Sequence, residues 1–197
     1  MRGEIVGIGF ASLALAAAIA VLSGCVPVVI GAGVATGVVV AADRRTSGTM
    51  LDDEVIEDRA SLTIQERFKG DFHVNVTSYN GIVLLTGEVP AEQAKTDVED
   101  IVRSNPKVRA VQDELLVGPV TDLGSRSNDT LITSKVKARF VEANKFQINY
   151  VKVVTERGVV YLMGIVTRDE GNAAGELAST TAGVQRVVKV FEYIIIG

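Results

Sequence analysis

The sequence repeats itself, and this repeat constrains the fold more than any other feature. A ten-residue stretch recurs once: residues 80–89 read NGIVLLTGEV and residues 157–166 read RGVVYLMGIV. Gly81 therefore returns as Gly158, and a downstream valine, Val108, returns as Val184 at nearly the same offset. Two copies of one structural unit are the simplest explanation. The chain of 197 residues is long enough to hold two such small domains.

Each copy predicts the same order of elements: helix, strand, turn, strand, helix, strand. In the first copy Asp52 or Asp53 is the expected N-cap of a helix, because apolar residues then recur at four-residue steps at Ile56, Ala60, Ile64 and Phe68. Asn80-Gly81 predicts a tight hairpin turn. Pro90 is expected to open the second helix, and residues 108–117 to form the third strand.

In the second copy Asn128 is the expected N-cap of a helix with Ile132, Val136 and Phe140 on its inner stripe. Thr167 and Glu170 have the spacing of a capping box before the second helix.

A hairpin followed by a third strand, reached through a helix, predicts an α+β fold of two tandem αββαβ domains. Each has a three-stranded mixed sheet with two helices on one face. The expected domains are residues 52–117 and 128–197, joined by a linker at 118–127. Strands that are apolar on both faces, such as residues 82–85, indicate that the sheet surface opposite the helices is also covered.

The N-terminal segment predicts export and lipidation. An apolar, uncharged run at residues 5–22 ends in Leu22-Ser23-Gly24-Cys25, which resembles a bacterial lipobox. Residues 1–24 are then a lipoprotein signal peptide, and residues 25–51 a lipidated N-terminus and linker. Cys25, the only cysteine, would carry a diacylglycerol and an N-acyl chain such as palmitate. The alternatives are an uncleaved signal anchor and a secreted protein with a free thiol.

The residue inventory gives no support for catalysis. One histidine and one cysteine exclude a Cys/His zinc cage, and the sequence has no serine-hydrolase elbow, zinc-protease pair or calcium loop. His73 corresponds to Tyr150 in the second copy, so we interpret it as an ordinary strand-end side chain. Acidic pairs such as Asp169-Glu170 suit the first turn of a helix. We expect no enzyme, no metal site and no cofactor beyond the acyl chains, with a carboxylate-pair hydrolase as the remaining catalytic alternative.

The two copies differ in charge. Residues 52–117 hold 14 acidic and 7 basic residues, whereas residues 128–197 hold 7 acidic and 9 basic residues. The second copy is therefore the candidate for contact with an anionic membrane. In its first helix Leu131, Lys135 and Arg139 form a stripe beside the core face, with Lys137 to one side. The alternative is a charged face that contacts only water. The acidic, exported chain argues against nucleic acid as a partner.

The lipobox, the polar spacer and the two tandem units with central glycines Gly87 and Gly164 resemble the dual BON-domain lipoproteins of the Gram-negative outer membrane. The resemblance implies non-catalytic modules, of which the second binds anionic phospholipid, either phosphatidylglycerol or cardiolipin. It also implies support for outer-membrane integrity and association with the barrel-assembly machinery.

The resemblance further implies a lipid-anchored protein in the outer membrane that faces the periplasm, because Val26 rather than Asp follows Cys25. Where the family carries a Trp early in the first helix of the second copy, this chain has Leu131, which lacks the ring that favours the headgroup level. The alternative function is a protein-interaction module of the assembly machinery, with lipid binding incidental.

Overall fold

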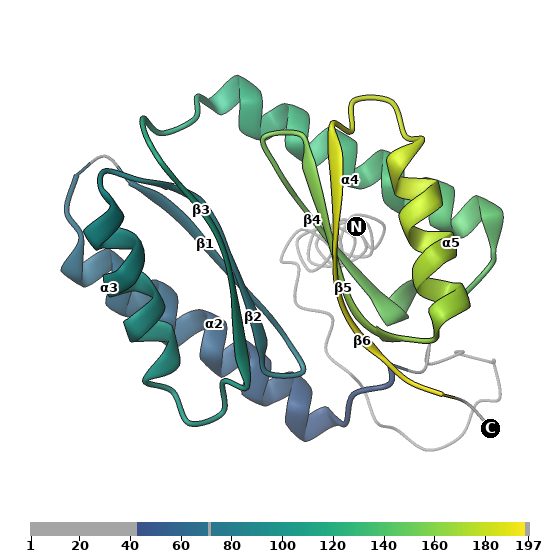
Figure 1. Ribbon diagram of the computed structural model, residues 1–197, viewed down its shortest axis with the longest axis horizontal. Helices are drawn as coiled ribbons and strands as arrows, with labels where there is room; N and C mark the ends of the chain where they lie inside the picture. The colour runs from purple at the N-terminus through teal and green to yellow at the C-terminus, as the bar shows by residue number, and fades with distance from the viewer. Residues whose placement is uncertain (1–42, 71, 196–197) are drawn as a thin grey trace, which may run out of the picture. The chain divides into compact units, whose positions relative to one another are not determined.

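The computed structural model describes residues 43–70 and 72–195 (Figure 1). The predicted signal peptide and Cys25 lie outside these residues. The first copy contains α2 (Ser47–Arg67), β1 (His73–Tyr79), β2 (Ile82–Val89), α3 (Glu92–Arg103) and β3 (Ala110–Val117). The second contains α4 (Leu123–Ala143), a 3₁₀ turn η1 (Ile148–Tyr150), β4 (Val151–Glu156), β5 (Val159–Val166), α5 (Arg168–Ser179) and β6 (Arg186–Tyr193). The chain from Val40 to Gly197 forms one compact unit.

Both copies build the same mixed sheet. In the first, β1 pairs antiparallel with β2 and β2 pairs parallel with β3; β4, β5 and β6 repeat this pattern. Asn80 and Gly81 have φ values of 55° and 72°, as a tight hairpin turn requires. Figure 1 shows α2 and α3 on one face of the first sheet, and α4 and α5 on one face of the second. The predicted α+β fold of two αββαβ units is confirmed.

Each domain has its own core between its helices and its sheet. In the first domain Ile56, Ala60 and Ile64 of α2 are buried against α3 and the sheet. In the second, Ile132, Val136 and Phe140 of α4 occupy the equivalent positions. The predicted inner stripes of both helices are confirmed.

The faces of the two sheets that carry no helices share a third apolar cluster. It joins Tyr79 and Leu84 of the first domain to Tyr161 and Met163 of the second. Alternation along β2 explains this arrangement, because Val83 faces the helices of its own domain while Leu84 points to the opposite side. The prediction that this sheet surface is covered is confirmed, and the other domain is what covers it.

The predicted helix starts were wrong in three places. The helix α2 begins at Ser47 with Thr46 as its N-cap, α4 begins at Leu123 with Asp122 as its N-cap, and α3 begins at Glu92 after Ala91 rather than at Pro90. The side chains of Thr46 and Asp122 accept hydrogen bonds from Thr49 N and Ser125 N, which leaves the expected caps inside the helices. The first five residues of α4 therefore belong to the segment predicted as linker. The capping box of Thr167 and Glu170 is confirmed.

Candidate functional site

The predicted lipid-binding residues lie on α4, on the side away from its core. Leu131 is 59% exposed, and Lys135 and Lys137 are exposed as well. Within residues 43–70 and 72–195 neither lysine forms an ion pair or a side-chain hydrogen bond. Both ammonium groups are therefore available to an external anion.

Arg139, the third predicted cation of the stripe, is engaged within its own domain. Its Nη1 donates to the carbonyl oxygen of Leu177 at 2.8 Å and to the hydroxyls of Thr180 at 2.8 Å and Thr181 at 3.1 Å. A cation at these positions satisfies the C-terminal end of α5 and complements its dipole. Arg139 thus has a structural contact that Lys135 and Lys137 lack.

The equivalent helix of the first domain carries the opposite charge. The helix α2 contains six acidic and two basic residues, whereas α4 contains two acidic and four basic residues. Because Asp53 and Asp129 are both buried, the difference lies in the exposed side chains. The charge asymmetry of the two copies is thus concentrated on equivalent helices.

A buried aspartate on each of these helices holds the adjacent hairpin turn. Asp129 accepts hydrogen bonds from Arg157 N and Gly158 N, both at 2.8 Å. Asp53 accepts the equivalent bonds from Asn80 N and Gly81 N, also at 2.8 Å. This repeated contact fixes each first helix to its own sheet. Sequence reasoning missed it, although the repeat itself aligns Asp53 with Asp129.

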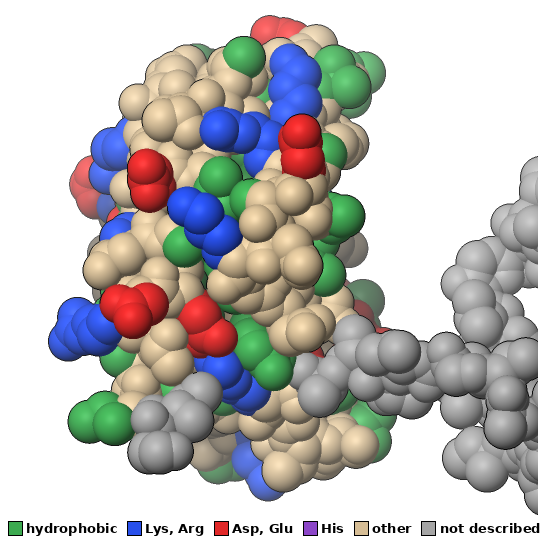
Figure 2. Space-filling view, turned by 90° about the vertical axis from the view of Figure 1, so that its right-hand side faces the viewer, with side chains coloured by type: hydrophobic (Ala, Val, Ile, Leu, Met, Phe, Trp, Pro, Cys, Tyr) green, Lys and Arg blue, Asp and Glu red, His purple; other side chains and the backbone are tan. Residues whose placement is uncertain are grey.

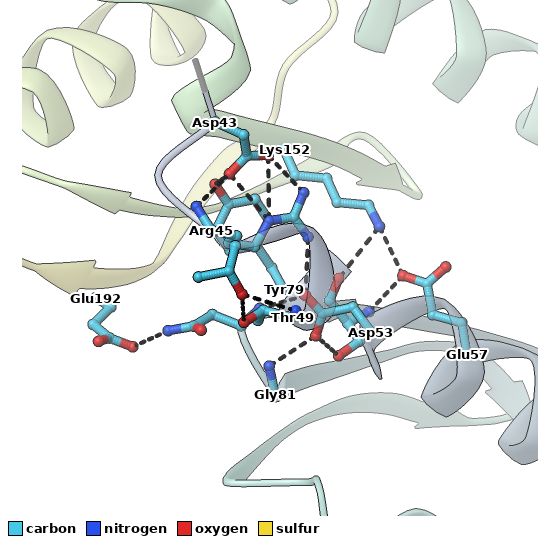
Figure 3. Close-up of polar contacts among 12 residues, drawn as sticks. Asp43, Arg45, Thr49, Asp53, Glu57, Tyr79, Gly81, Lys152 and Glu192 are labelled. Atoms are coloured by element: carbon cyan, nitrogen blue, oxygen red, sulfur yellow. Dashed lines mark hydrogen bonds and ion pairs between the residues drawn. The ribbon is translucent and has the colours of Figure 1, made fainter. Parts of the chain in front are cut away.

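Asp53 is also the centre of a polar network (Figure 3). Its carboxylate accepts from Ser78 Oγ at 2.6 Å and from Arg45 Nη1 at 2.9 Å, and Arg45 in turn pairs with Asp43 at 2.8 Å. Burial acts to raise the pKa of Asp53, but the hydrogen bonds from Ser78, Gly81, Asn80 and Arg45 outweigh it and lower that pKa. Asp53 is therefore held ionised.

The segment before α2 is bound to both domains through two arginines. Arg45 lies over the ring of Tyr79 in the first domain, with its guanidinium carbon 3.9 Å from the ring centre. Arg44 lies 3.8 Å from the ring centre of Tyr150 in the second domain, and its two terminal nitrogens pair with Glu170 at 2.6 and 2.9 Å. The hydrogen bond with Arg44 is the largest cause that lowers the pKa of Glu170.

Polar side chains also connect the two domains. Lys152 Nζ pairs with Glu57 at 2.7 Å, as Figure 3 shows, and Asn80 Nδ2 donates to Glu192 at 3.0 Å. Asn75 Nδ2 donates to Glu156 at 2.9 Å.

Beside Asn75, His73, Glu88 and Glu156 come together from β1, β2 and β4. His73 Nδ1 lies 3.4 Å from Glu88 Oε2 and 4.0 Å from Glu156 Oε1. Burial raises the pKa of Glu156; the hydrogen bond from Asn75 and the charge of His73 oppose this, while the carboxylates of Glu88 and Asp129 add to it. His73 is thus more than a strand-end side chain, and sequence reasoning missed both glutamates. The available signal was Glu88, a charged residue within an apolar strand.

The other predicted site residues have different positions. Cys25 lies outside the described residues, so its acylation stays a prediction. An added Cβ at Gly87 would overlap the carbonyl oxygen of His73 on β1, and one at Gly164 would overlap that of Tyr150, just before β4. Both glycines thus allow close approach of two backbones.

Comparison with known proteins agrees with this architecture. The model of the BON domain matches the chain twice, over residues 52–119 and 128–194. The chain belongs to the BON-domain family. It is 38% identical over 175 residues to the outer membrane lipoprotein DolP of Haemophilus influenzae, a match that covers 88% of this chain and 90% of DolP.

Two further relatives show lower identity. The 21 kDa hemolysin of Actinobacillus pleuropneumoniae is 32% identical over 154 residues, covering 77% of this chain and 79% of the relative. The osmotically-inducible protein Y of Escherichia coli K12 is 26% identical over 145 residues, covering 71% and 72%.

The predicted resemblance to dual BON-domain lipoproteins is confirmed. With two BON domains and this extent of identity to DolP, the chain is an outer-membrane lipoprotein of the DolP type. Among the helices within residues 43–70 and 72–195, none has the length and apolar character needed to cross a membrane.

Proposed function

We propose that this BON-domain lipoprotein is a non-catalytic protein that faces the periplasm, is anchored through acyl chains on Cys25 and docks α4 on anionic phospholipid. In this way it supports the integrity of the outer membrane. The observation that carries the proposal is that Lys135 and Lys137, beside the exposed Leu131, have ammonium groups without an ion-pair partner among the described residues. The equivalent surface of α2 is acidic and would be repelled by the same lipids.

The expected contact is weak. Each free lysine near an anionic leaflet contributes about 1 kcal/mol, and burial of the exposed part of Leu131 adds about 1–2 kcal/mol. The total of about 3–4 kcal/mol corresponds to a dissociation constant near 1 mM. Figure 2 views the side on which α5 lies in Figure 1, and there basic, acidic and apolar side chains are interspersed rather than joined in one apolar patch.

The acyl chains make a weak contact sufficient. Attachment through two or three chains is effectively permanent, since each buried CH₂ contributes about 0.8 kcal/mol. Tethering then raises the local concentration of α4 at the membrane to about the millimolar range. The contact of α4 would decide how the domain sits on the membrane, while the acyl chains hold it there.

The test is vesicle binding by the compact unit Val40–Gly197, which keeps Arg44 and Arg45. Phosphatidylglycerol vesicles should shift NMR signals of residues 129–141, and phosphatidylcholine vesicles should not. The double variant Lys135→Gln, Lys137→Gln should bind about 30-fold more weakly, because it removes about 2 kcal/mol.

The matched control is Arg59→Gln, since Arg59 takes the place of Lys135 on the equivalent helix when Asp53 is aligned with Asp129. This variant should leave binding unchanged. Equal binding to both lipids, or an unchanged affinity of the double lysine variant, would refute the lipid assignment.

A second candidate function is favoured by the exposed face of α2. Leu51 and Leu62 are 62% and 59% exposed there, among acidic side chains. An apolar surface with an acidic border fits a basic protein partner, and the barrel-assembly machinery is the partner we propose. A photocrosslinker at Leu62 in the intact envelope should yield an adduct with that machinery, and one at Val141 on α4 should not.

A further inference from the structure

Three side chains suited to metal binding meet between the two sheets. His73 and Glu88 are directly paired across β1 and β2, so their side chains share one face of the first sheet. Glu156 ends β4 and faces the same space from the second domain. One ligand atom from each of the three lies within 4.8 Å of the other two. The site therefore needs both domains.

Glu88 has unused ligand capacity in this cluster. Its side chain is 0% exposed, and among the described residues its Oε1 has no hydrogen-bond partner. The nearest cation is Arg157 Nη1 at 3.5 Å, on a side chain that is nearly half exposed. Two buried carboxylates lie close together beside the imidazole, and one partly exposed arginine at 3.5 Å compensates their charge only in part.

The surroundings orient the three ligands and leave a route of entry. Thr121 donates its N–H and its hydroxyl to Glu88 Oε2, both at 3.2 Å, and Asn75 holds Glu156 at 2.9 Å. Outer hydrogen bonds of this kind fix the direction of metal ligands. A cleft of about 490 Å³ is lined by His73, Asn75 and Glu156 on one side and by α4 on the other. It gives an ion and its water access to the cluster.

We propose that His73, Glu88 and Glu156 form an interdomain binding site for a divalent first-row metal ion, with Zn²⁺ as the best match. One imidazole nitrogen with carboxylate oxygens suits Zn²⁺, whereas Mg²⁺ and Ca²⁺ prefer oxygen ligands alone. Tetrahedral Zn²⁺ places adjacent ligand atoms about 3.3 Å apart. The separations of 3.4 and 4.0 Å from His73 Nδ1 approach this value, so small side-chain rotations complete the geometry. Water from the cleft supplies the fourth ligand.

A metal at this position would fasten the two domains together. His73 and Glu88 belong to the first domain and Glu156 to the second, so the bound ion adds a link that the apolar cluster of Tyr79, Leu84, Tyr161 and Met163 does not provide. Since metal affinity adds to the stability of the state that binds it, Zn²⁺ should resist separation of the sheets.

The single histidine makes the test direct. The full-length protein is purified in detergent, freed of metal with a chelator and titrated with ZnCl₂. Calorimetry should give one site, and the only imidazole Hε1 signal in the NMR spectrum should move with the same stoichiometry. MgCl₂ should move neither. The imidazole readout needs no variant and so does not depend on whether a substitution folds.

Variants then assign the ligands. Glu156→Gln and His73→Gln should each lower the Zn²⁺ affinity at least about tenfold. Glu192→Gln, which alters another interdomain carboxylate, should leave it unchanged. A histidine signal that does not shift at saturating Zn²⁺, or an unchanged affinity in Glu156→Gln, would overturn the proposal.

Discussion

Replacement of Asp129 by alanine tests the contact that joins each first helix to its sheet. Asp129 is 5% exposed, and its carboxylate accepts hydrogen bonds from two backbone N–H groups of the β4–β5 turn. A hydrogen bond to a charged group contributes about 1.5–3 kcal/mol, and a buried donor left without a partner costs a similar amount. Asp129→Ala should therefore lower the free energy of unfolding by about 3–5 kcal/mol. Asp129→Asn keeps one acceptor oxygen and should lose about half of this.

Urea unfolding of the Val40–Gly197 unit, followed by circular dichroism, measures the loss. Hydrogen exchange at the Gly158 amide locates it, since this N–H loses its acceptor in Asp129→Ala. The control is Asp169→Ala, because Asp169 is exposed in the first turn of α5 and contributes about 0.5 kcal/mol through the helix dipole. A loss for Asp129→Ala within about 1 kcal/mol of the control would refute the reasoning that these hydrogen bonds hold the turn.

Three further substitutions have defined outcomes. Gly87→Ala should lower the free energy of unfolding, measured by thermal melting, by about 3 kcal/mol or more. The new Cβ would overlap the neighbouring strand, and Gly87 has a φ of 113°. Arg44→Ala should lower the free energy of unfolding by about 3 kcal/mol at pH 7. Arg44 lowers the pKa of Glu170, so Glu170 binds fewer protons in the folded protein than in the unfolded chain at the same pH. The ion pair therefore stabilises the fold fully at pH values above 4.5, the ordinary pKa of the glutamate, and this stabilisation is lost as the pH falls through the lowered pKa of the folded state. Urea midpoints for Arg44→Ala and the parent chain should therefore converge in acid. Leu131→Trp should bind phosphatidylglycerol vesicles several-fold more tightly, which a vesicle titration checks, and equal affinity would contradict the position of α4 at the headgroups.

The elements that follow from local periodicity could be predicted from the sequence. Ile56, Ala60 and Ile64 recur with the helical period and are buried, and Asn80-Gly81 forms the turn that its residue types favour. Because the second copy repeats the first, the same helix and turn could be predicted there as well. These features depend on residues close together in the chain, so the sequence alone was sufficient.

The helix starts could not be predicted because several residues near each start are suited to the N-cap position. Asp52, Asp53 and Asn128 are good N-caps by type, but Thr46 and Asp122 occupy that position in the structure. Asp53 instead accepts hydrogen bonds from a turn 27 and 28 residues away. Tertiary contacts therefore decided which of the candidate caps was used.

The candidate metal cluster could not be predicted from the sequence for a different reason. His73, Glu88 and Glu156 fit no spacing motif, since Glu156 comes from the other domain and meets the first two only when the sheets pack together. Motif reasoning therefore predicted no metal site. Glu88 continues the alternation of Ile82 and Leu84 on the interdomain face, and a charge in that series was the one local sign of a special environment.

The packing of the two sheets also limits which surfaces can contact a partner. The helix-free faces are covered by each other through Tyr79 and Tyr161, so they are not available to a lipid or to another protein. Among the helices whose outer faces stay exposed, the equivalent pair α2 and α4 differs most in charge. Because Arg139 is occupied at the end of α5, the proposed attraction of α4 for an anionic membrane would depend on Lys135 and Lys137. Their replacement should therefore remove the proposed lipid contact without affecting the fold or the proposed acyl anchor.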